Sequence, residues 1–143
     1  MDDKLIFQLS QAEYLVKNYV AKKMKHQGII LSSGQVGILF LLEKNEGMNM
    51  SELSRILGSD NSAITRLIDR LETLGLVIRT AHRDDRRQNI ISITEKGKAE
   101  AEKAGIIARE TNEKIKEGFN DEELAAFKKI LFSFHDKFKI GLS

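Results

Sequence analysis

The chain has 143 residues, of which 41% are hydrophobic and 31% charged, and a net charge of +2, which suits one domain or one compact subunit. It contains no cysteine, which excludes disulfides, thiol redox switches and zinc–thiolate sites. It lacks an apolar run of about 18 residues that could span a membrane, and its start, "MDDKLIFQLS", does not resemble a signal peptide. We therefore expect a cytoplasmic protein with no membrane partner.

The N-terminal part of the chain predicts two helices. The first covers residues 5–26, and the pattern breaks around Gly28. A second helix should begin near Ser33 and end in the segment "EKNEG". The apolar stripe of the first helix recurs at spacings of three and four, as one helix face requires, and comprises Leu5, Leu9, Ala12, Val16, Tyr19 and Val20.

Two further helices are expected in the middle of the chain. Asn49 followed by Glu52 has capping-box spacing, which predicts a short third helix that stops at Gly58. Ser59 or Asp60 can cap a fourth helix. Its apolar face should hold Ile64, Leu67, Ile68, Leu71 and Leu74. At about 100° per residue, its opposite face should hold Ser62, Thr65, Arg66, Asp69 and Thr73, with Arg70 at the flank.

The remaining elements are a β-hairpin and two helices. The segments "LVIRTA" and "NIISIT" are typical of strands, and they flank a charged tip, "HRDDRRQ". Thr94 can cap a long helix that runs to about Gly118. Asn120 with Glu123 repeats the capping-box spacing and predicts a last helix. The order of elements indicates a mainly α fold of six helices with a small β-hairpin wing, a winged helix-turn-helix.

The arginines are concentrated in this middle region. Seven of the eight lie between residues 55 and 87, where none of the 15 lysines lies. Arginine bonds bidentately to phosphate and to guanine edges and loses its hydration more readily than lysine. The hairpin carries four of the arginines (Arg79, Arg83, Arg86 and Arg87), which it cannot bury, so their charge should meet solvent or a polyanion. The alternative is surface ion pairing with five carboxylates in the same window: Asp60, Asp69, Glu72, Asp84 and Asp85.

A winged helix-turn-helix places its second helix in the major groove of double-stranded DNA. Small polar residues near the start of that helix permit close approach, and arginines on the helix and the wing can reach bases, phosphates or the narrow minor groove. Asp85 is expected to brace Arg87 and limit its rotamers. The alternatives are an ordinary solvated helix face and a charged tip that merely keeps the strands soluble. The candidate DNA-binding residues are Asn61, Ser62, Thr65, Arg66, Arg70, Arg83, Arg86 and Arg87.

The segments "DRRQNIISITEKG" and "SAITRLIDRLETLGLVIR" resemble the wing signature and the recognition helix of the MarR family of bacterial transcription regulators. The resemblance covers nearly the whole chain. It implies that Arg87 enters the minor groove and that Ser62, Thr65 and Arg66 contact DNA. It also implies a homodimer with intertwined terminal helices and a small aromatic or phenolic effector. The chain has no N-terminal cysteine, so the chemistry of the family's cysteine-based peroxide sensors is not expected.

Apolar stripes on the terminal helices independently favour a dimer, because a lone subunit would leave these side chains exposed to solvent. The alternative is that they cover the core of the monomer. We expect residues 1–30 and 98–143 to form the dimerisation helices and residues 33–97 to form the DNA-binding part. The target should then be a near-palindrome with half-sites about one DNA turn apart, roughly 34–36 Å.

The sequence therefore predicts a homodimeric, sequence-specific transcription regulator, a repressor released by an effector. No enzyme, metal site or cofactor is expected, because His26, His82 and His135 match no ligand spacing and no nucleotide-binding glycine motif is present. Two alternatives remain open. One is a winged-helix module that binds proteins and not DNA. The other is a protein that binds or converts a small molecule in a cleft of its own.

Overall fold

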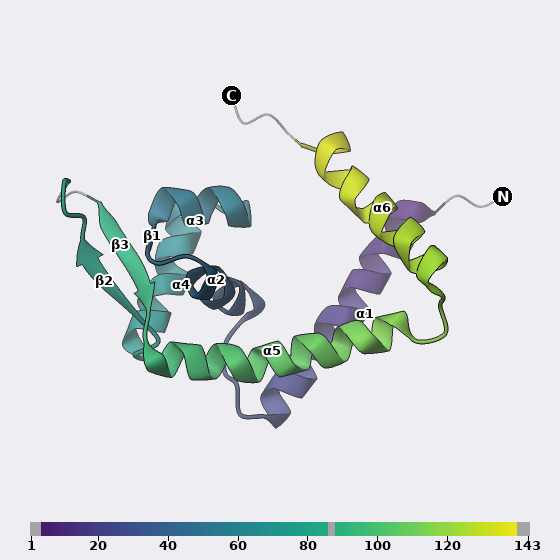
Figure 1. Cartoon of the computed structure of the whole chain (residues 1–143), viewed down its shortest axis with the longest axis horizontal. Helices are drawn as coiled ribbons and strands as arrows, with labels where there is room; N and C mark the ends of the chain where they lie inside the picture. The colour runs from purple at the N-terminus through teal and green to yellow at the C-terminus, as the bar shows by residue number, and fades with distance from the viewer. Residues whose placement is uncertain (1–3, 86–87, 140–143) are drawn as a thin grey trace. The chain divides into compact units, whose positions relative to one another are not determined.

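The computed structural model describes residues 4–85 and 88–139, and these form six helices and three strands (Figure 1). The residues group into two compact units, Met1–Ala108 and Arg109–Ser143. The division into dimerisation helices and a DNA-binding part is a functional one and stays a prediction. The elements are α1 (Leu5–His26), α2 (Ser33–Lys44), β1 (Met48–Asn49), α3 (Met50–Leu57), α4 (Asn61–Thr73), β2 (Val77–Ala81), β3 (Asn89–Ile93), α5 (Glu95–Lys116) and α6 (Asp121–Lys137).

The helices begin where the sequence places capping residues. Asn49 accepts a hydrogen bond from the backbone N–H of Glu52, and Asn120 forms a full capping box with Glu123. Of the two candidates for α4, Asp60 is the cap, because its Oδ1 accepts from the N–H of Ala63 at 2.7 Å. Each cap satisfies an N–H group that a helix start would otherwise leave unpaired. The six predicted helices are thus confirmed.

The predicted hairpin is confirmed, and a third strand joins it. The sheet is antiparallel in the order β1-β3-β2, so Ile91 of β3 pairs with Met48 on one side and Arg79 on the other. The two-residue strand β1 was not expected from the sequence, because it is too short to show any alternation. Gly47, just before it, has φ +75°, and a Cβ there would lie 2.6 Å from the Ile90 side chain.

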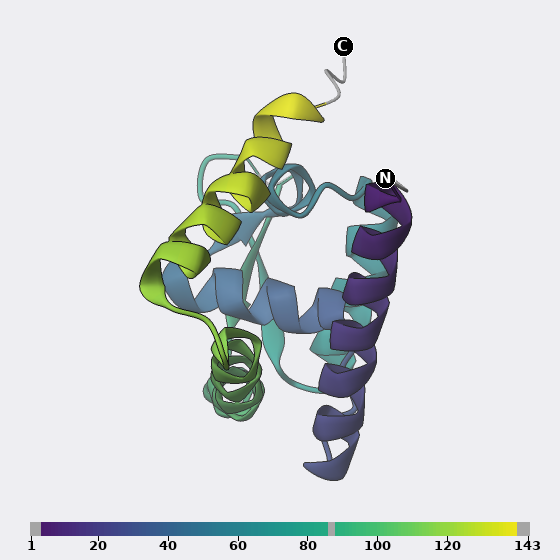
Figure 2. The same cartoon turned by 90° about the vertical axis from the view of Figure 1, so that its right-hand side faces the viewer.

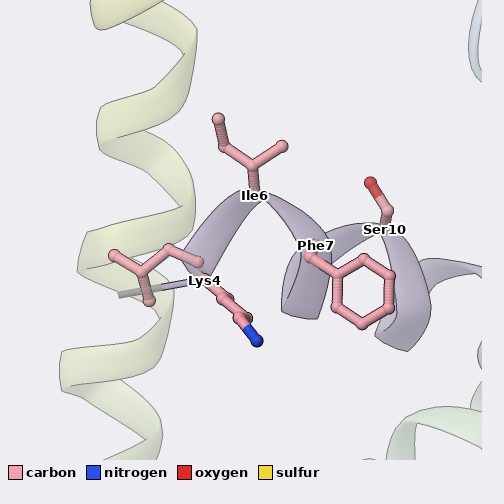
Figure 3. Close-up of a pocket in the computed structure, with 5 residues that line it drawn as sticks. Lys4, Ile6, Phe7 and Ser10 are labelled. Carbon is pink, nitrogen blue, oxygen red and sulfur yellow. The ribbon is translucent and has the colours of Figure 1, made fainter. Parts of the chain in front are cut away.

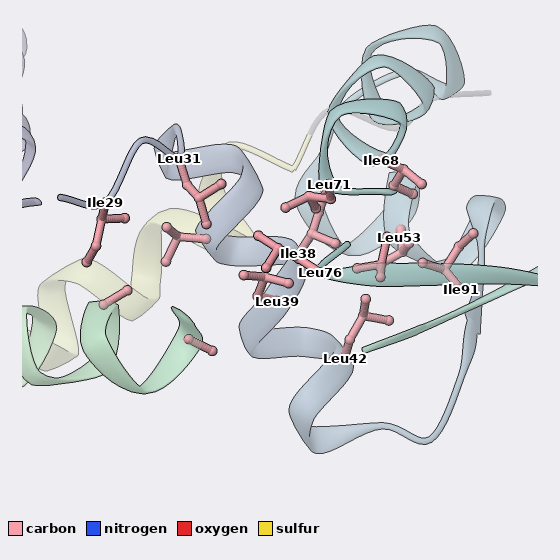
Figure 4. Close-up of a cluster of buried hydrophobic side chains, with 14 of the residues drawn as sticks. Ile29, Leu31, Ile38, Leu39, Leu42, Leu53, Ile68, Leu71, Leu76 and Ile91 are labelled. Carbon is pink, nitrogen blue, oxygen red and sulfur yellow. The ribbon is translucent and has the colours of Figure 1, made fainter. Parts of the chain in front are cut away.

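One hydrophobic core lies in the first unit and joins α2, α3, α4 and the sheet (Figure 4). Ile64, Ile68 and Leu71 on α4 are fully buried, as the predicted apolar face requires. Leu53 of α3 and Ile91 of β3 are also fully buried and pack in the same cluster. This core therefore fixes α3, α4 and the hairpin as one body.

The helices at the two ends of the chain contribute unequally to that core, and α5 adds Ala101, Ala104 and Ile107 to it. In α1 only Met24 is buried, and in α6 no residue is. Figure 2 shows α1 in purple, with α2 in blue running crosswise to it. Within the described residues, no helix combines the length and apolar character needed to cross a bilayer.

Figure 3 shows the first turns of α1, where a shallow pocket is lined only by residues of this segment. Ile6 is 85% exposed, and Leu5 and Phe7 are also exposed. In the second unit, a second apolar groove follows the end of α5 and α6 and is lined by Ile115, Phe119, Leu124, Phe127 and Ile130, with Glu123 and Ala126. Both features are uncovered helix faces. These exposed faces favour a dimer, and the alternative that the terminal stripes cover the monomer's own core stays open.

Candidate nucleic-acid interface

A tight turn fixes α4 against α3. Gly58 ends α3 in the left-handed conformation, with φ 66°, and its N–H donates to the carbonyl of Ser54. The hydroxyl of Ser54 donates to Oδ1 of Asn61 at 2.5 Å and so ties the end of one helix to the start of the next. This is the arrangement of a helix-turn-helix, in which the first helix holds the second at a defined angle.

The outer face of α4 carries the polar residues that the periodicity predicts. Ser62, Arg66 and Arg70 are exposed, on the side away from the buried Ile64 and Ile68. The face begins at the helix N-terminus, where backbone N–H groups favour anions. It can therefore present hydroxyls, N–H groups and guanidinium groups to one ligand.

Two of the predicted contact residues also have roles inside the protein. Asn61 accepts the hydrogen bond from Ser54, and Thr65 donates its hydroxyl proton to the carbonyl of Asn61 at 2.7 Å. Thr65 is half-buried. These bonds hold the first turn of α4 in place, so Asn61 and Thr65 are less free to reorient than Ser62 or Arg66.

Four arginines of the region form no ion pair with any other residue that the structure describes. Their side chains are exposed, and a guanidinium without a carboxylate partner can meet a phosphate without first breaking an internal bond. They are Arg55 in the last turn of α3, Arg66 and Arg70 on α4, and Arg83 in the wing.

Arg79 behaves differently, and the expectation that all four hairpin arginines meet solvent or polyanion is wrong for it. Its side chain is only 23% exposed and pairs through Nη2 with Oδ1 of Asp69, while its Nε lies 3.5 Å from Oε1 of Glu72. The pairing places β2 against the last turns of α4. It also neutralises Asp69, which the periodicity places on the same face of α4 as Arg66.

The tip of the wing is organised by local hydrogen bonds. The N–H of His82 donates to the carbonyl of Gln88 at 2.8 Å, and Nδ1 of His82 accepts from the N–H of Asp84 at 3.1 Å. Arg86 and Arg87 lie outside the described residues, so their DNA contacts and the bracing of Arg87 by Asp85 stay predictions.

No group of three or more histidine, aspartate or glutamate side chains that could hold a metal ion occurs in residues 4–85 and 88–139. The polar residues that the fold does gather are hydroxyls and guanidinium groups around a helix N-terminus and a wing. Such a surface is suited to bind a polyanion.

Comparisons with known proteins agree with this geometry. Residues 31–88 match the model of the MarR family. The HTH-type transcriptional repressor YetL of Bacillus subtilis (strain 168) is 30% identical over 131 residues, which cover 85% of this chain and 77% of that protein. A crystal structure of CouR from Rhodococcus jostii RHA1 bound to p-coumaroyl-CoA is 28% identical, with a TM-score of 0.78, and the match covers 92% of this chain and 91% of that one.

A structure described as the transcriptional repressor CouR bound to a 23-mer DNA duplex is 27% identical, with a TM-score of 0.82 and 91% of both chains covered. The similarity therefore spans the terminal helices as well as the winged part. Because the relatives and the solved structures are transcription regulators and the helix-turn-helix and wing match in place, the chain belongs to the MarR family of winged-helix transcription regulators.

Proposed function

We propose that the protein is a homodimeric repressor that occupies a near-palindromic operator and is released by a small-molecule effector. The observation that carries the proposal is the contrast among the arginines. Arg79 neutralises Asp69, whereas Arg66 and Arg70 on the same helix stay exposed and form no ion pair with a described residue. The polar face of α4 therefore keeps a net positive charge for DNA.

The roles of the contact residues follow from their positions. Arg66 lies one turn into α4, where a side chain can reach a guanine edge in the major groove, and Arg70 lies at the flank, where phosphate is closer. Asn61, Ser62 and Thr65 line the start of the helix and approach bases or phosphates closely. Arg83, together with Arg86 and Arg87, is assigned to the backbone or the minor groove beside the wing.

The uncovered terminal helices support the homodimer. Leu5, Phe7, Phe127, Leu131 and Phe138 are all exposed in the single chain. Burying each such side chain contributes about 1.5–3 kcal/mol, so two copies gain most by covering these faces mutually. A two-fold dimer then presents two copies of α4 to successive major grooves, roughly 34 Å apart.

A pocket in the first unit supports the effector. It lies between the second half of α1 and the segment that leads into α2, and its apolar lining includes Val16, Val20, Met24, Ile29 and Leu31. Lys17 and Asn18 add polar groups at its edge. A small aromatic molecule suits such a site, and CouR was crystallised with p-coumaroyl-CoA. Tyr14 is exposed and Phe40 packs against the core, so neither is assigned to the site.

An effector in that pocket would act by favouring a conformation in which the two copies of α4 are wrongly spaced for DNA. The proposal includes no catalytic step, metal or cofactor, in line with relatives that are named as regulators. It places the protein in the cytoplasm, where bacterial promoter DNA lies.

The test is selection of genomic fragments by the purified protein, followed by measurement of affinity for the retained sequence at several salt concentrations. We expect a near-palindrome with half-sites about 10 base pairs apart and an affinity that falls steeply with salt. A flat response to salt, or fragments with no common sequence, would contradict the proposal and favour a protein-interaction module.

A further inference from the structure

The end of α4, the recognition helix, is tied to the start of α5 by a compact joint, which we call the clasp. It lies entirely in the first unit, at the point where the hairpin leaves α4 and returns to α5. On one side it consists of three backbone carbonyls, and on the other of side-chain and backbone groups in the first turn of α5. The clasp comprises Leu74, Gly75, Leu76, Thr94, Lys96 and Gly97.

Thr94 makes three of the hydrogen bonds. Its hydroxyl donates to the carbonyl of Gly75 at 2.7 Å and accepts from the N–H of Gly97 at 3.0 Å. Its backbone N–H donates to the carbonyl of Leu76 at 3.0 Å. One side chain therefore caps the start of α5, as the sequence predicts, and at the same time binds the segment just after α4.

Lys96 and Gly97 complete the clasp. Nζ of Lys96 donates to the carbonyl of Leu74 at 3.0 Å, which places a positive charge at the negative end of the α4 dipole. Gly97 is buried, and a Cβ at this position would collide with the carbonyl oxygen of Leu76 and the side chain of Ile93. The first turn of α5 therefore approaches the segment just after α4 as closely as a glycine allows.

A small tilt of α4 at the clasp would displace the DNA-contacting residues at its far end. The DNA-reading residues Asn61, Ser62 and Thr65 lie at the opposite end of α4, which has 13 residues. At 1.5 Å per residue α4 is about 20 Å long, so a tilt of about 5° at the clasp moves its far end by roughly 2 Å. That displacement is comparable to the tolerance of a hydrogen bond to a base edge.

We propose that the clasp sets the angle of the recognition helix relative to α5, and that Thr94 and Lys96 are positioning residues for specific DNA binding. The inference rests on the proposed function. It adds the path by which a motion of α5 would reach α4, namely the hydrogen bonds of the clasp. Neither residue needs to touch DNA. Their loss should therefore weaken recognition of the operator without weakening the general attraction to phosphate.

The test compares Thr94→Val with the wild type and with Thr94→Ser, which restores the hydroxyl. Affinity is measured for the selected operator duplex and for a random duplex of equal length, each at several salt concentrations. Thermal unfolding midpoints are measured in parallel. Losing two hydrogen bonds should lower operator affinity by about three- to tenfold. Affinity for the random duplex and the salt slope should stay unchanged, and Thr94→Ser should recover wild-type affinity.

Asn45→Ala is the control, because it removes a side-chain hydrogen bond made only at the end of α2, from Nδ2 to the carbonyl of Leu41 at 2.9 Å, away from the face assigned to DNA. It should bind the operator as the wild type does. Lys96→Met keeps the aliphatic chain and removes the donor, and about a threefold loss of operator affinity is expected. If Thr94→Val does not fold, the operator affinity of Lys96→Met tests the positioning role by itself.

The inference is overturned if folded Thr94→Val and Lys96→Met bind the operator as the wild type does, well below their unfolding midpoints. It is also overturned if operator and random duplex weaken equally, since that would indicate lost phosphate contacts. A wild-type protein that selects no DNA would instead refute the proposed function, and the positioning role with it.

Discussion

The winged part and the terminal helices of this chain bury their apolar residues to very different degrees. In the winged part, Leu53, Ile64, Ile68, Leu71 and Ile91 are fully buried in a core that α2, α3, α4 and the sheet share with parts of α1 and α5. In α6, by contrast, no residue is buried, although Phe127 and Leu131 lie along it and Phe138 follows as its C-cap. The winged part therefore has a closed core within one copy, whereas the exposed apolar faces of α1 and α6 are the surfaces that the proposed dimer would cover.

The contrast separates two kinds of substitution. Changes in the winged part should act on DNA contacts or on the folding of one chain. Changes on the exposed apolar faces should act on assembly, and therefore on DNA binding only through the loss of the second half-site.

The largest effect is expected for Leu131→Glu. The substitution places a charge on a face that the proposed dimer would bury, where an unpaired carboxylate is strongly unfavourable. The protein should become monomeric in analytical ultracentrifugation. Operator affinity should fall by at least about 100-fold, because each chain then holds only one half-site. Lys129→Gln makes the same one-unit change in charge on the opposite side of α6 and should remain a dimer. A dimeric Leu131→Glu variant would show that this face is not the interface.

Gly97→Ala should be the most destabilising change in the winged part. Its methyl group would collide with the carbonyl of Leu76, and overpacking of this kind costs about 2–3 kcal/mol in the free energy of unfolding. The control is Gly37→Ala on α2, where the new Cβ would meet only a Leu57 methyl at 3.6 Å. The control should be neutral or more stable by up to about 1 kcal/mol. Equal unfolding midpoints for both variants in urea would argue against the close approach at the clasp.

A smaller effect is expected for Arg66→Gln. Losing one base contact in each half-site should lower operator affinity by about tenfold or more and relax the sequence preference at one position. Selection of binding sequences from a randomised library reports that preference directly. An unchanged sequence profile would mean that Arg66 contacts only the backbone.

The smallest effect is expected for Arg79→Gln, because its partners Asp69 and Glu72 are 58% and 45% exposed. Ion pairs as exposed as these contribute about 1 kcal/mol or less to the free energy of unfolding. Operator affinity should fall about two- to threefold, since Asp69 then carries an unpaired negative charge toward DNA. The double variant Asp69→Asn with Arg79→Gln should recover that affinity, and a double variant weaker than the single one would contradict the pairing.

Local patterns explain what the sequence predicted well. The caps Asp60 and Asn120 and the apolar face of α4 depend on residues within one or two turns of one another, so spacing alone reveals them. Thr94 was expected to cap α5 for the same reason, and its bond to the N–H of Gly97 confirms it.

Contacts between distant segments explain what the sequence could not predict. Arg79 meets Asp69 only because β2 folds back along α4, and the hydroxyl of Thr94 meets the carbonyl of Gly75 nineteen positions earlier. The strand β1 forms because β3 offers a free edge to two residues with no pattern of their own. A count of arginines therefore overestimated the charge available to DNA until their partners were known.

The salt dependence of operator binding by Arg70→Gln, compared with Arg79→Gln, tests the central claim most directly. Each lost phosphate contact lowers the slope of log affinity against log salt by about 0.9. A dimer loses two contacts per substitution, so Arg70→Gln should reduce the slope by about 1.8, whereas the internally paired Arg79 should leave it unchanged. Equal slopes for Arg70→Gln and the wild type, or an equal reduction in both variants, would contradict the account.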